Sequence, residues 1–312
     1  MQRHDIVVIG ASAGGVAALQ TLLSGLPAEL PASVFVVIHI PSDIPSMLPE
    51  ILSRAGPLPC VQAADGEHFR PGTVYVAAPD RHMVFQDGNV RLARGPKENR
   101  FRPSVDTLFR SAADAFGPRV IGVILTGGLN DGALGLRAVK KEGGIAIVQD
   151  PLEAEFGAMP QSALEWTPVD YKQPVAAIAA TIARLADGAG TSLETAPALG
   201  ADMADEREAG QPTGFTCPEC HGSLWELRDG EVVHFRCRVG HGFSASSLVE
   251  AQDEDVENAI WAALRALEES AVLSRKLEQD ARGRNSARVA ERFARKAGEQ
   301  EKHASVLRRL LD

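Results

Sequence analysis

The sequence has little of what marks membrane, secreted or nucleic-acid-binding proteins. It contains no run of about 18 apolar residues, and its first apolar stretch, Ile6 to Ile9, is too short for a signal sequence or a membrane span. Its four cysteines, three of them clustered late, do not make a disulfide framework in a chain of 312 residues. A net charge of -9 argues against nucleic acid, whose binding depends on clustered Lys and Arg. We therefore expect a cytoplasmic protein that neither inserts into a membrane nor binds nucleic acid.

Short β-branched runs alternate with Ala- and Leu-rich helical stretches, and the hydrophobic content of 45% is ordinary for a folded domain. The expected strands span 6–9, 34–40, 120–125 and 145–148, and the expected helices span 14–26 and 134–142. Strands that alternate with helices predict an α/β fold, a doubly wound and mostly parallel sheet with helices on both faces.

Further runs complete the organisation of the chain. Residues 72–78 indicate another strand, and 83–85 with 90–92 indicate a hairpin that turns at Asp87-Gly88-Asn89. A stretch rich in Gly, Ala, Asp, Glu and Pro without periodicity predicts a linker. The predicted parts are a catalytic domain (1–186), this linker (187–213), a zinc-ribbon-like segment (214–245) and a helical hairpin (246–312).

A glycine-rich loop, residues 10–15, lies between the first strand and the first helix. A dinucleotide-binding loop needs glycine at its middle position and an acidic residue after the second strand, but Ser12 and His39 stand at these positions. The pattern Gly-x-Ser-x-Gly instead fits a nucleophile elbow, a tight turn that exposes the serine oxygen at a helix N-terminus. Ser12 is therefore a candidate nucleophile.

Two more strand ends carry polar residues. His39 follows the second predicted strand, and Asp131 lies in the loop after 120–125. Each alone fits a cap or a turn, but together with Ser12 they supply a hydroxyl, an imidazole base and an orienting carboxylate. The chain order Ser, His, Asp differs from that of the common α/β-hydrolases, so the sequence disfavours that fold.

Six motifs in order make residues 4–186 resemble the CheB-type protein-glutamate methylesterases of bacterial chemotaxis. These motifs are Gly-Ala-Ser-Ala-Gly-Gly at 10–15, His-Ile-Pro at 39–41, residues 72–82 with Ala-Pro-Asp-Arg-His at 78–82, Arg-Pro-Ser-Val-Asp at 102–106, Leu-Thr-Gly at 125–127, and Asn-Asp-Gly at 130–132.

The resemblance implies that Ser12, His39 and Asp131 form a triad that hydrolyses glutamate methyl esters on receptor helices, and that glutamine deamidation is also within reach. It implies no cofactor for this chemistry. The family usually carries a receiver domain upstream as a switch, and we expect that switch to be absent here. The sequence departs from the family pattern at Ala13, at Ile40 and at Gly128-Leu129.

The resemblance and the loop chemistry also name supporting residues. Backbone N–H groups of Ala13 and Gly128 are candidates for the oxyanion hole, where a backbone donor survives a change of side chain. Arg102 either orients an acidic substrate or pairs with a structural carboxylate. His82 is an alternative base, although Asp80-Arg81-His82 also fits a turn.

The late cysteines have the spacing of a zinc ribbon. Cys217 and Cys220 form one pair, Cys237 and His241 form a second pair, and a predicted strand hairpin around Asp229-Gly230 joins them. We expect one structural zinc ion, with His221 or His234 as alternative fourth ligands. Free thiols or a Cys217–Cys220 redox pair is the other interpretation, and Cys60 is expected to be inert.

The remaining residues show helical periodicity broken at Gly283. An acidic early part, Glu250 to Glu257, and a basic second helix predict an antiparallel hairpin. This hairpin offers a surface for packing within the chain, for a homo-oligomer, or for docking on a methylated chemoreceptor or another helical signalling protein. A different class of function, an inactive scaffold that binds receptor or kinase helices, also fits the sequence.

Overall fold

The computed structural model describes residues 4–39, 46–188 and 210–311. These residues form two compact units, Met1–Leu248 and Val249–Asp312, and each is described by itself. Ile40 and most of the predicted linker lie outside the described residues.

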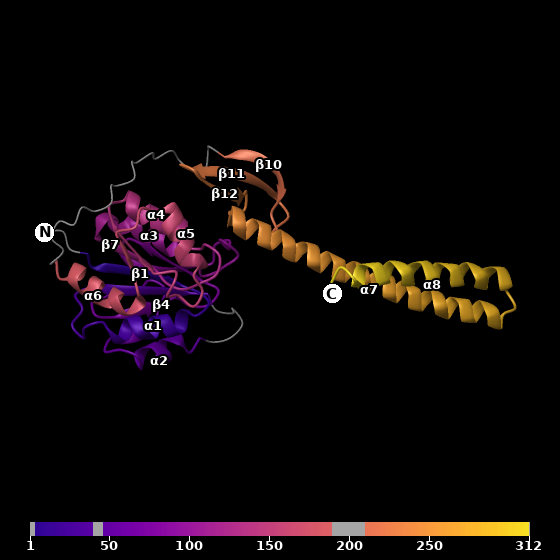
Figure 1. The fold of residues 1–312 in the computed structure, drawn as a ribbon, viewed down its shortest axis with the longest axis horizontal. Helices are drawn as coiled ribbons and strands as arrows, with labels where there is room; N and C mark the ends of the chain where they lie inside the picture. Colours follow the sequence, from indigo (N-terminus) through magenta and orange to yellow (C-terminus); the bar gives the residue numbers. More distant parts are fainter. Residues whose placement is uncertain (1–3, 40–45, 189–209, 312) are drawn as a thin grey trace. The chain divides into compact units, whose positions relative to one another are not determined.

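A seven-stranded parallel sheet forms the centre of the first unit (Figure 1). Its strands, in spatial order, are β3 (Cys60–Gln62), β4 (Val74–Val76), β2 (Ser33–Ile38), β1 (Ile6–Ala11), β7 (Val120–Ile124), β8 (Ile145–Gln149) and β9 (Tyr171–Gln173). The runs of Val and Ile in β1, β2, β7 and β8 are buried throughout, as expected for a parallel sheet covered on both faces.

Helices cover both faces of this sheet, which confirms the predicted parallel α/β architecture (Figure 1). One face packs against α1 (Gly15–Ser24), α2 (Leu48–Ser53) and α6 (Val175–Ala186), and the other against α3 (Val105–Phe116), α4 (Ala133–Lys141) and α5 (Ala158–Trp166). A short 3-10 turn, Gly117–Arg119, leads from α3 into β7. Alternate residues of each strand enter the two apolar clusters, so both clusters hold β1 in place.

The chain leaves β1 toward β2 on one side and returns to pair β7 on the other. The boundary between β1 and β7 is therefore the point where strand order reverses, and ligands of open α/β sheets bind outside the carboxyl ends of strands at such a point. Apart from the sheet, β5 (His82–Gln86) and β6 (Asn89–Ala93) form the predicted hairpin. Asp87 and Gly88 both have positive φ there, the geometry of a type I′ turn.

A four-stranded antiparallel sheet follows within the same unit. It consists of β10 (Gln211–Thr216), β11 (Ser223–Asp229), β12 (Val232–Cys237) and β13 (Gly242–Ser244). The predicted linker end at residue 213 is too late, because β10 already begins at Gln211. Pro212 is tolerated there because β10 is an edge strand with an irregular register.

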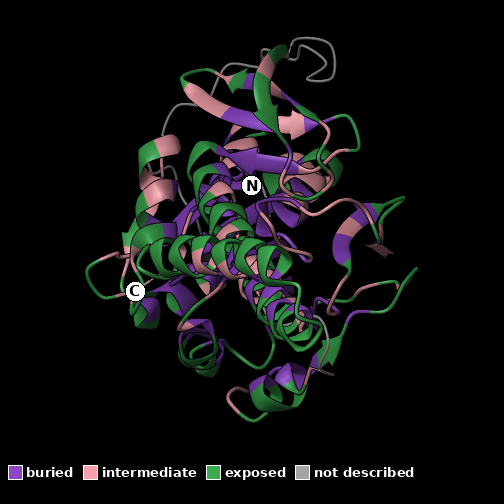
Figure 2. Cartoon of the chain, turned by 90° about the vertical axis from the view of Figure 1, so that its right-hand side faces the viewer, coloured by how far each residue is buried: buried purple, intermediate pink, exposed green. Residues whose placement is uncertain are grey.

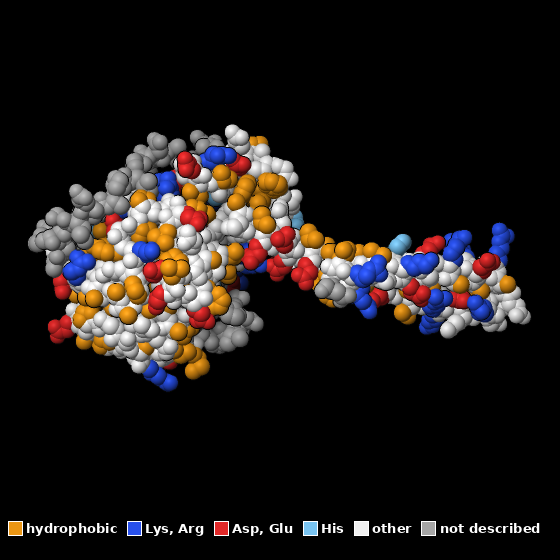
Figure 3. All heavy atoms as spheres, viewed as in Figure 1, with side chains coloured by type: hydrophobic (Ala, Val, Ile, Leu, Met, Phe, Trp, Pro, Cys, Tyr) orange, Lys and Arg blue, Asp and Glu red, His pale blue; other side chains and the backbone are white. Residues whose placement is uncertain are grey.

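The second unit is a helical hairpin made of most of α7 (Ala245–Gly283) and of α8 (Ala287–Arg308). The helices separate at the predicted break, and each contributes buried small residues, such as Ala271 of α7 and Ala297 of α8. Arg275 pairs with Glu301 across the hairpin at 2.8 Å. Most of the hairpin's surface is exposed (Figure 2), and both signs of charge are interleaved along it (Figure 3). None of the described helices is long and apolar enough to cross a membrane.

Candidate active site

Ser12 lies at the sharp turn between β1 and α1. Its backbone N–H donates to Thr126 O at 3.0 Å, which fastens the turn to the end of β7. Gly14 begins α1 with a φ of 72°, a conformation that favours glycine. A Cβ atom on Gly127 would lie 2.9 Å from the Ser12 Cβ, so glycine is needed where the two strand ends meet. The local sequence therefore builds the predicted elbow.

His39 follows β2 and reaches the serine across the edge of the sheet. Its Nδ1 lies 3.1 Å from Ser12 Oγ, and its Nε2 lies 2.8 Å from Asp131 Oδ2. Because the Asp131 carboxylate accepts, Nε2 carries the proton and Nδ1 keeps a lone pair for the serine hydroxyl. The side chain of His39 is only 5% exposed, so this chain of contacts is shielded from water.

Asp131 is completely buried and accepts from five donors. They are His39 Nε2, Val105 N, Ser104 Oγ, Asn99 Nδ2 and Asp106 N, at 2.7 to 3.2 Å. Two of these donors are backbone N–H groups at the start of α3, where the helix dipole also favours a negative charge. The Arg-Pro-Ser-Val-Asp motif thus serves as a carboxylate cradle.

The neighbouring buried carboxyl groups of Asp131 and Asp106 have pKa values displaced in opposite directions. Burial by itself would raise the pKa of Asp131, but the hydrogen bond and charge of His39, with the bonds from Val105 and Asn99, hold it below its ordinary value. Asp106 lies beside it, and burial together with the charge of Asp131 raises its pKa well above the ordinary value. Asp131 is therefore the member of this pair that carries the charge.

A loop over residues 97–101 completes the site, and no sequence pattern pointed to this loop. Asn99 donates from Nδ2 to both Asp131 Oδ1 and Asp106 Oδ2, at 3.1 and 2.8 Å. The Phe101 ring stacks on the His39 imidazole with centroids 3.5 Å apart and an angle of 4°. Asn99 and Arg100 have positive φ, and this backbone directs the loop into the site.

The candidate oxyanion donors lie on either side of Ser12. Among the described residues, neither the Ala13 nor the Gly128 backbone N–H donates to another protein group, whereas the Gly127 N–H is bonded to Phe156 O. A Cβ at Gly128 would meet nothing within 4 Å, so this position has room for a side chain. The next residue, Leu129, has a φ of 59° and sets the loop's course toward Asp131.

Arg102 and His82 have partners inside the protein. Arg102 donates from Nε and Nη2 to Asp80 Oδ1 and from Nη1 to Gly95 O, the structural one of its two predicted roles. His82 is bonded at Nε2 to Pro96 O and accepts at Nδ1 from the Ser104 N–H. Burial lowers the pKa of His82. His39, and not His82, is the imidazole that contacts Ser12.

Known proteins share this part of the chain. The family model described as CheB methylesterase matches residues 7–182. The chain belongs to the CheB methylesterase family. It is thereby a carboxylic ester hydrolase of the methylesterase type, as its sequence predicted.

Individual members of the CheB methylesterase family agree with this assignment. A protein-glutamate methylesterase/protein-glutamine glutaminase of Anaeromyxobacter dehalogenans is 41% identical over 190 residues, which cover 60% of this chain and 53% of the relative. A relative in Leptospira interrogans is 39% identical over 183 residues, 58% of this chain and 95% of its own length. The crystal structure of the Thermotoga maritima CheB methylesterase catalytic domain matches with a TM-score of 0.56 and 36% identity, covering 58% of this chain and 98% of that domain.

The late cysteines lie beyond the part matched by the CheB methylesterase model. Candidate ligand atoms of Cys217, Cys220, Cys237 and His241 all lie within 4.8 Å of one another. The predicted alternatives His221 and His234 are not in this group. Whether the four residues bind zinc remains a prediction.

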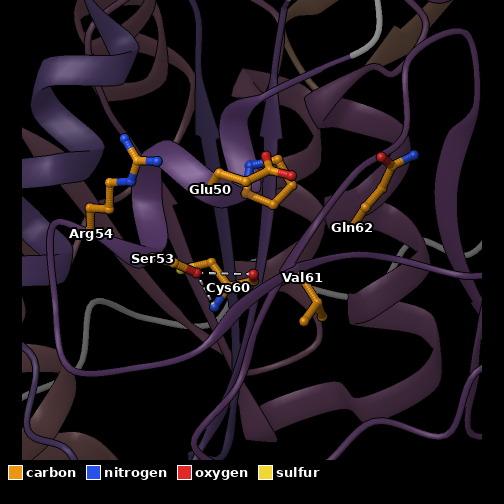
Figure 4. A pocket seen from close by; sticks show the side chains of 7 residues that line it. Glu50, Ser53, Arg54, Cys60, Val61 and Gln62 are labelled. Carbon is orange, nitrogen blue, oxygen red and sulfur yellow. Dashed lines mark hydrogen bonds between the residues drawn. The ribbon is translucent and has the colours of Figure 1, made fainter.

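Figure 4 shows a hollow between α2 and β3, and the triad residues are not part of its lining. It is lined by Pro49, Glu50, Ser53, Arg54, Cys60, Val61 and Gln62. Ser53 Oγ donates to the Cys60 carbonyl and accepts from its N–H, so the two segments are fastened together there. Burial raises the pKa of the Cys60 thiol, which fits the prediction of an inert cysteine.

Proposed function

We propose that this chain hydrolyses glutamate methyl esters on the cytoplasmic helices of a chemoreceptor, with Ser12, His39 and Asp131 as its triad. The observation that carries the proposal is the continuous contact from Ser12 Oγ through His39 to Asp131. This contact lies at the carboxyl ends of β1 and β7, where the strand order reverses. The names of its relatives indicate the methylated glutamate substrate and the related hydrolysis of glutamine side chains.

Each residue has a defined part in the proposed reaction. Ser12 Oγ attacks the ester carbonyl while His39 Nδ1 accepts its proton, and Asp131 stabilises the imidazolium. The proposed donors to the negative oxygen of the tetrahedral intermediate are the Ala13 and Gly128 N–H groups, and the dipole of α1 favours its charge. The C–O bond to the methoxy group breaks, His39 returns the proton, and methanol leaves. Water then repeats these steps on the acyl-enzyme and frees the glutamate.

The test is hydrolysis of a glutamate methyl-ester peptide, together with labelling by a serine-directed fluorophosphonate. Ser12→Ala is expected to abolish both signals, while Ser24→Ala, on the exposed end of α1, retains them. His39→Ala is expected to be nearly as severe as Ser12→Ala, and His82→Ala much milder. Folded protein without an adduct at Ser12 would favour the inactive scaffold instead.

A further inference from the structure

The cysteine-bearing segment contacts the very loop that supports the triad. Asn99 N–H donates to Gly242 O at 2.8 Å, and Gly242 N–H donates to Lys97 O at 3.3 Å. These two bonds pair β13 in parallel with the loop 97–101. The backbone that carries Asn99 and Phe101 is therefore held from outside the catalytic sheet.

The Asn99 side chain joins this segment to the catalytic carboxylate. Its Oδ1 accepts from Ser244 N and Ser247 Oγ at 3.0 and 3.1 Å, while its Nδ2 donates to Asp131 and Asp106. Asn99 is 3% exposed, so all four bonds form in a buried place where each lost partner is costly. If β13 and the first turn of α7 unfold, Asn99 Oδ1 loses both of its donors and the side chain is no longer fixed.

A second contact braces the residue next to Asp131. Asn130 donates from Nδ2 to Ser246 Oγ at 2.7 Å and accepts at Oδ1 from Ser244 Oγ at 2.8 Å. Asn130 is also buried. The same four-residue stretch, Ser244 to Ser247, thus fixes the loop of Asp131 as well as Asn99.

Two ion pairs connect the loop with residues adjacent to the cysteines. Arg236 Nη2 lies 3.2 Å from the buried Glu98, and Lys97 Nζ lies 3.0 Å from Glu219. Burial opposes ionisation of Glu98, but Arg110 and Arg236 hold its pKa below the ordinary value, so the pair is charged. Arg236 directly precedes Cys237, and Glu219 directly precedes Cys220.

The cluster of Cys217, Cys220, Cys237 and His241 has the dimensions of a tetrahedral zinc site. Cys220 Sγ and Cys237 Sγ are 3.6 Å apart, and His241 Nδ1 is 3.4 and 3.8 Å from the sulfurs of Cys237 and Cys217. Two thiolates on one Zn²⁺ at about 2.3 Å are separated by about 3.8 Å. Four protein ligands leave no open position, so the ion would be structural.

We infer that a Zn²⁺ ion bound by these four residues holds the loop 97–101 in place and that Asn99 is a positioning residue for Asp131. The inference rests on the proposed triad. Zinc loss unfolds the small segment, removes the partners of Asn99 and Asn130, and leaves the carboxylate and the stacked imidazole poorly fixed. The metal thereby controls esterase activity without touching the substrate.

The first test removes the metal from the full-length chain. Purified protein is expected to hold one equivalent of zinc, and phenanthroline in the presence of a reductant is expected to remove it. Ser12 labelling by a fluorophosphonate should then slow by about 10- to 100-fold and recover with added Zn²⁺, because small displacements of catalytic groups have effects of this size. Hydrogen exchange at the Asn99 amide should accelerate at the same time. Cys220→Ser should behave like the chelated protein, and Cys60→Ser like the wild type.

The second test separates positioning from folding. Asn99→Ala should keep its zinc but slow labelling by about 10-fold or more. The pH of half-maximal labelling should rise, because Asp131 loses a donor and stabilises the imidazolium more strongly. A general loss of folding would instead reduce labelling equally at every pH. Ser247→Ala, which removes one partner of Asn99, should show the same shift to a smaller extent.

Three results would overturn the inference. They are protein without bound zinc, labelling that stays within twofold of the wild type after zinc is lost, and labelling that becomes faster because the segment had blocked the site. Zinc-loaded wild type that is not labelled at Ser12 would instead contradict the triad itself, and the two failures are thus distinguishable.

Discussion

The α/β region and the cysteine-bearing sheet of the first unit are held together in different ways. The α/β region buries two large apolar clusters, one on each face of its central sheet. The four-stranded sheet buries far fewer apolar side chains, and polar contacts join it to the α/β region: Asp229 with Arg137 and Lys141, and the bonds around Asn99. A region with a large core folds by itself, whereas a small one needs a metal or a neighbour. The triad residues come from the α/β region, and the residues that hold Asn99 come in part from the four-stranded sheet.

Removal of zinc is expected to have the largest effect, and it should destabilise the four-stranded sheet far more than the α/β region. Structural zinc contributes on the order of 10 kcal/mol to small domains, more than the four-stranded sheet can replace. Hydrogen exchange of the chelated protein should show loss of protection throughout β10–β13, with protection in β1 and β7 retained. Equal loss of protection in both sheets would show that the two regions fold as one cooperative structure.

Asp131→Asn is expected to have the next largest effect, on activity more than on stability. The amide nitrogen can donate toward His39, which favours a proton on Nδ1 and removes the lone pair that Ser12 needs. We expect kcat to fall by about 10⁴-fold, as in other triads with this change. Hydrolysis of the methyl-ester peptide measures the loss, and Asp106→Asn is the matched control because its carboxyl has a raised pKa and does not contact His39. Equal losses in both variants would contradict the assignment of the charge to Asp131.

The sequence predicts the residues that follow strands far better than those that support them. Ser12, His39 and Asp131 were found because parallel strands end at one edge of the sheet and because each residue type suits acyl transfer. Asn99 and Phe101 lie in a loop with positive φ, and their roles depend on contacts far along the chain: Asn99 accepts from Ser244 and Ser247, and Phe101 stacks on His39. No local pattern encodes such contacts.

The elements of the fold also differ in how well the sequence predicts them. The buried strands and the hairpin at Asp87-Gly88 were predictable from period and turn chemistry. Helix α3 was not predicted, although Ser104 caps it by accepting from Thr107 N. The first three residues of β10, 211–213, fall in the predicted linker because Pro212 is typical of loops, and only pairing with β11 makes them part of a strand.

A truncation in the apolar core should have a smaller effect than zinc removal or Asp131→Asn, but a larger effect than a truncation at the surface. Leu19 on α1 is completely buried, and Leu19→Ala is expected to lower the free energy of unfolding by about 3 kcal/mol. Val239→Ala, between the candidate ligands Cys237 and His241, removes a side chain that is 63% exposed and should change the free energy of unfolding by less than about 0.5 kcal/mol. Denaturant unfolding followed by tryptophan fluorescence compares them. A larger loss of unfolding free energy for Val239→Ala would mean that apolar packing, and not the candidate ligands, holds residues 237–241 in place.

The ion pairs of Asp229 should give the smallest effect, and one that depends on pH. Burial opposes ionisation of Asp229, but Lys141 and then Arg137 hold its pKa below the ordinary value. Because its pKa is lowered, the Asp229 carboxylate stabilises the β11–β12 hairpin against α4 at every pH above the unfolded-state pKa, about pH 4. This stabilisation is lost as the pH falls through the folded-state pKa. Asp229→Asn should therefore reduce hydrogen-exchange protection of β11 and β12 by about 10-fold at pH 7, or about 1.4 kcal/mol.

This difference between Asp229→Asn and the wild type should shrink below about pH 4, because both side chains are then neutral. The matched control is Glu231→Gln, a change to an exposed acid in the same turn, which should leave protection unchanged at every pH. Zinc release at low pH affects wild type and variant alike, so only their difference reports on Asp229. A difference that persists at pH 3 would show that the amide disturbs packing rather than charge, and that the hairpin docks on α4 by shape instead of by ion pairs.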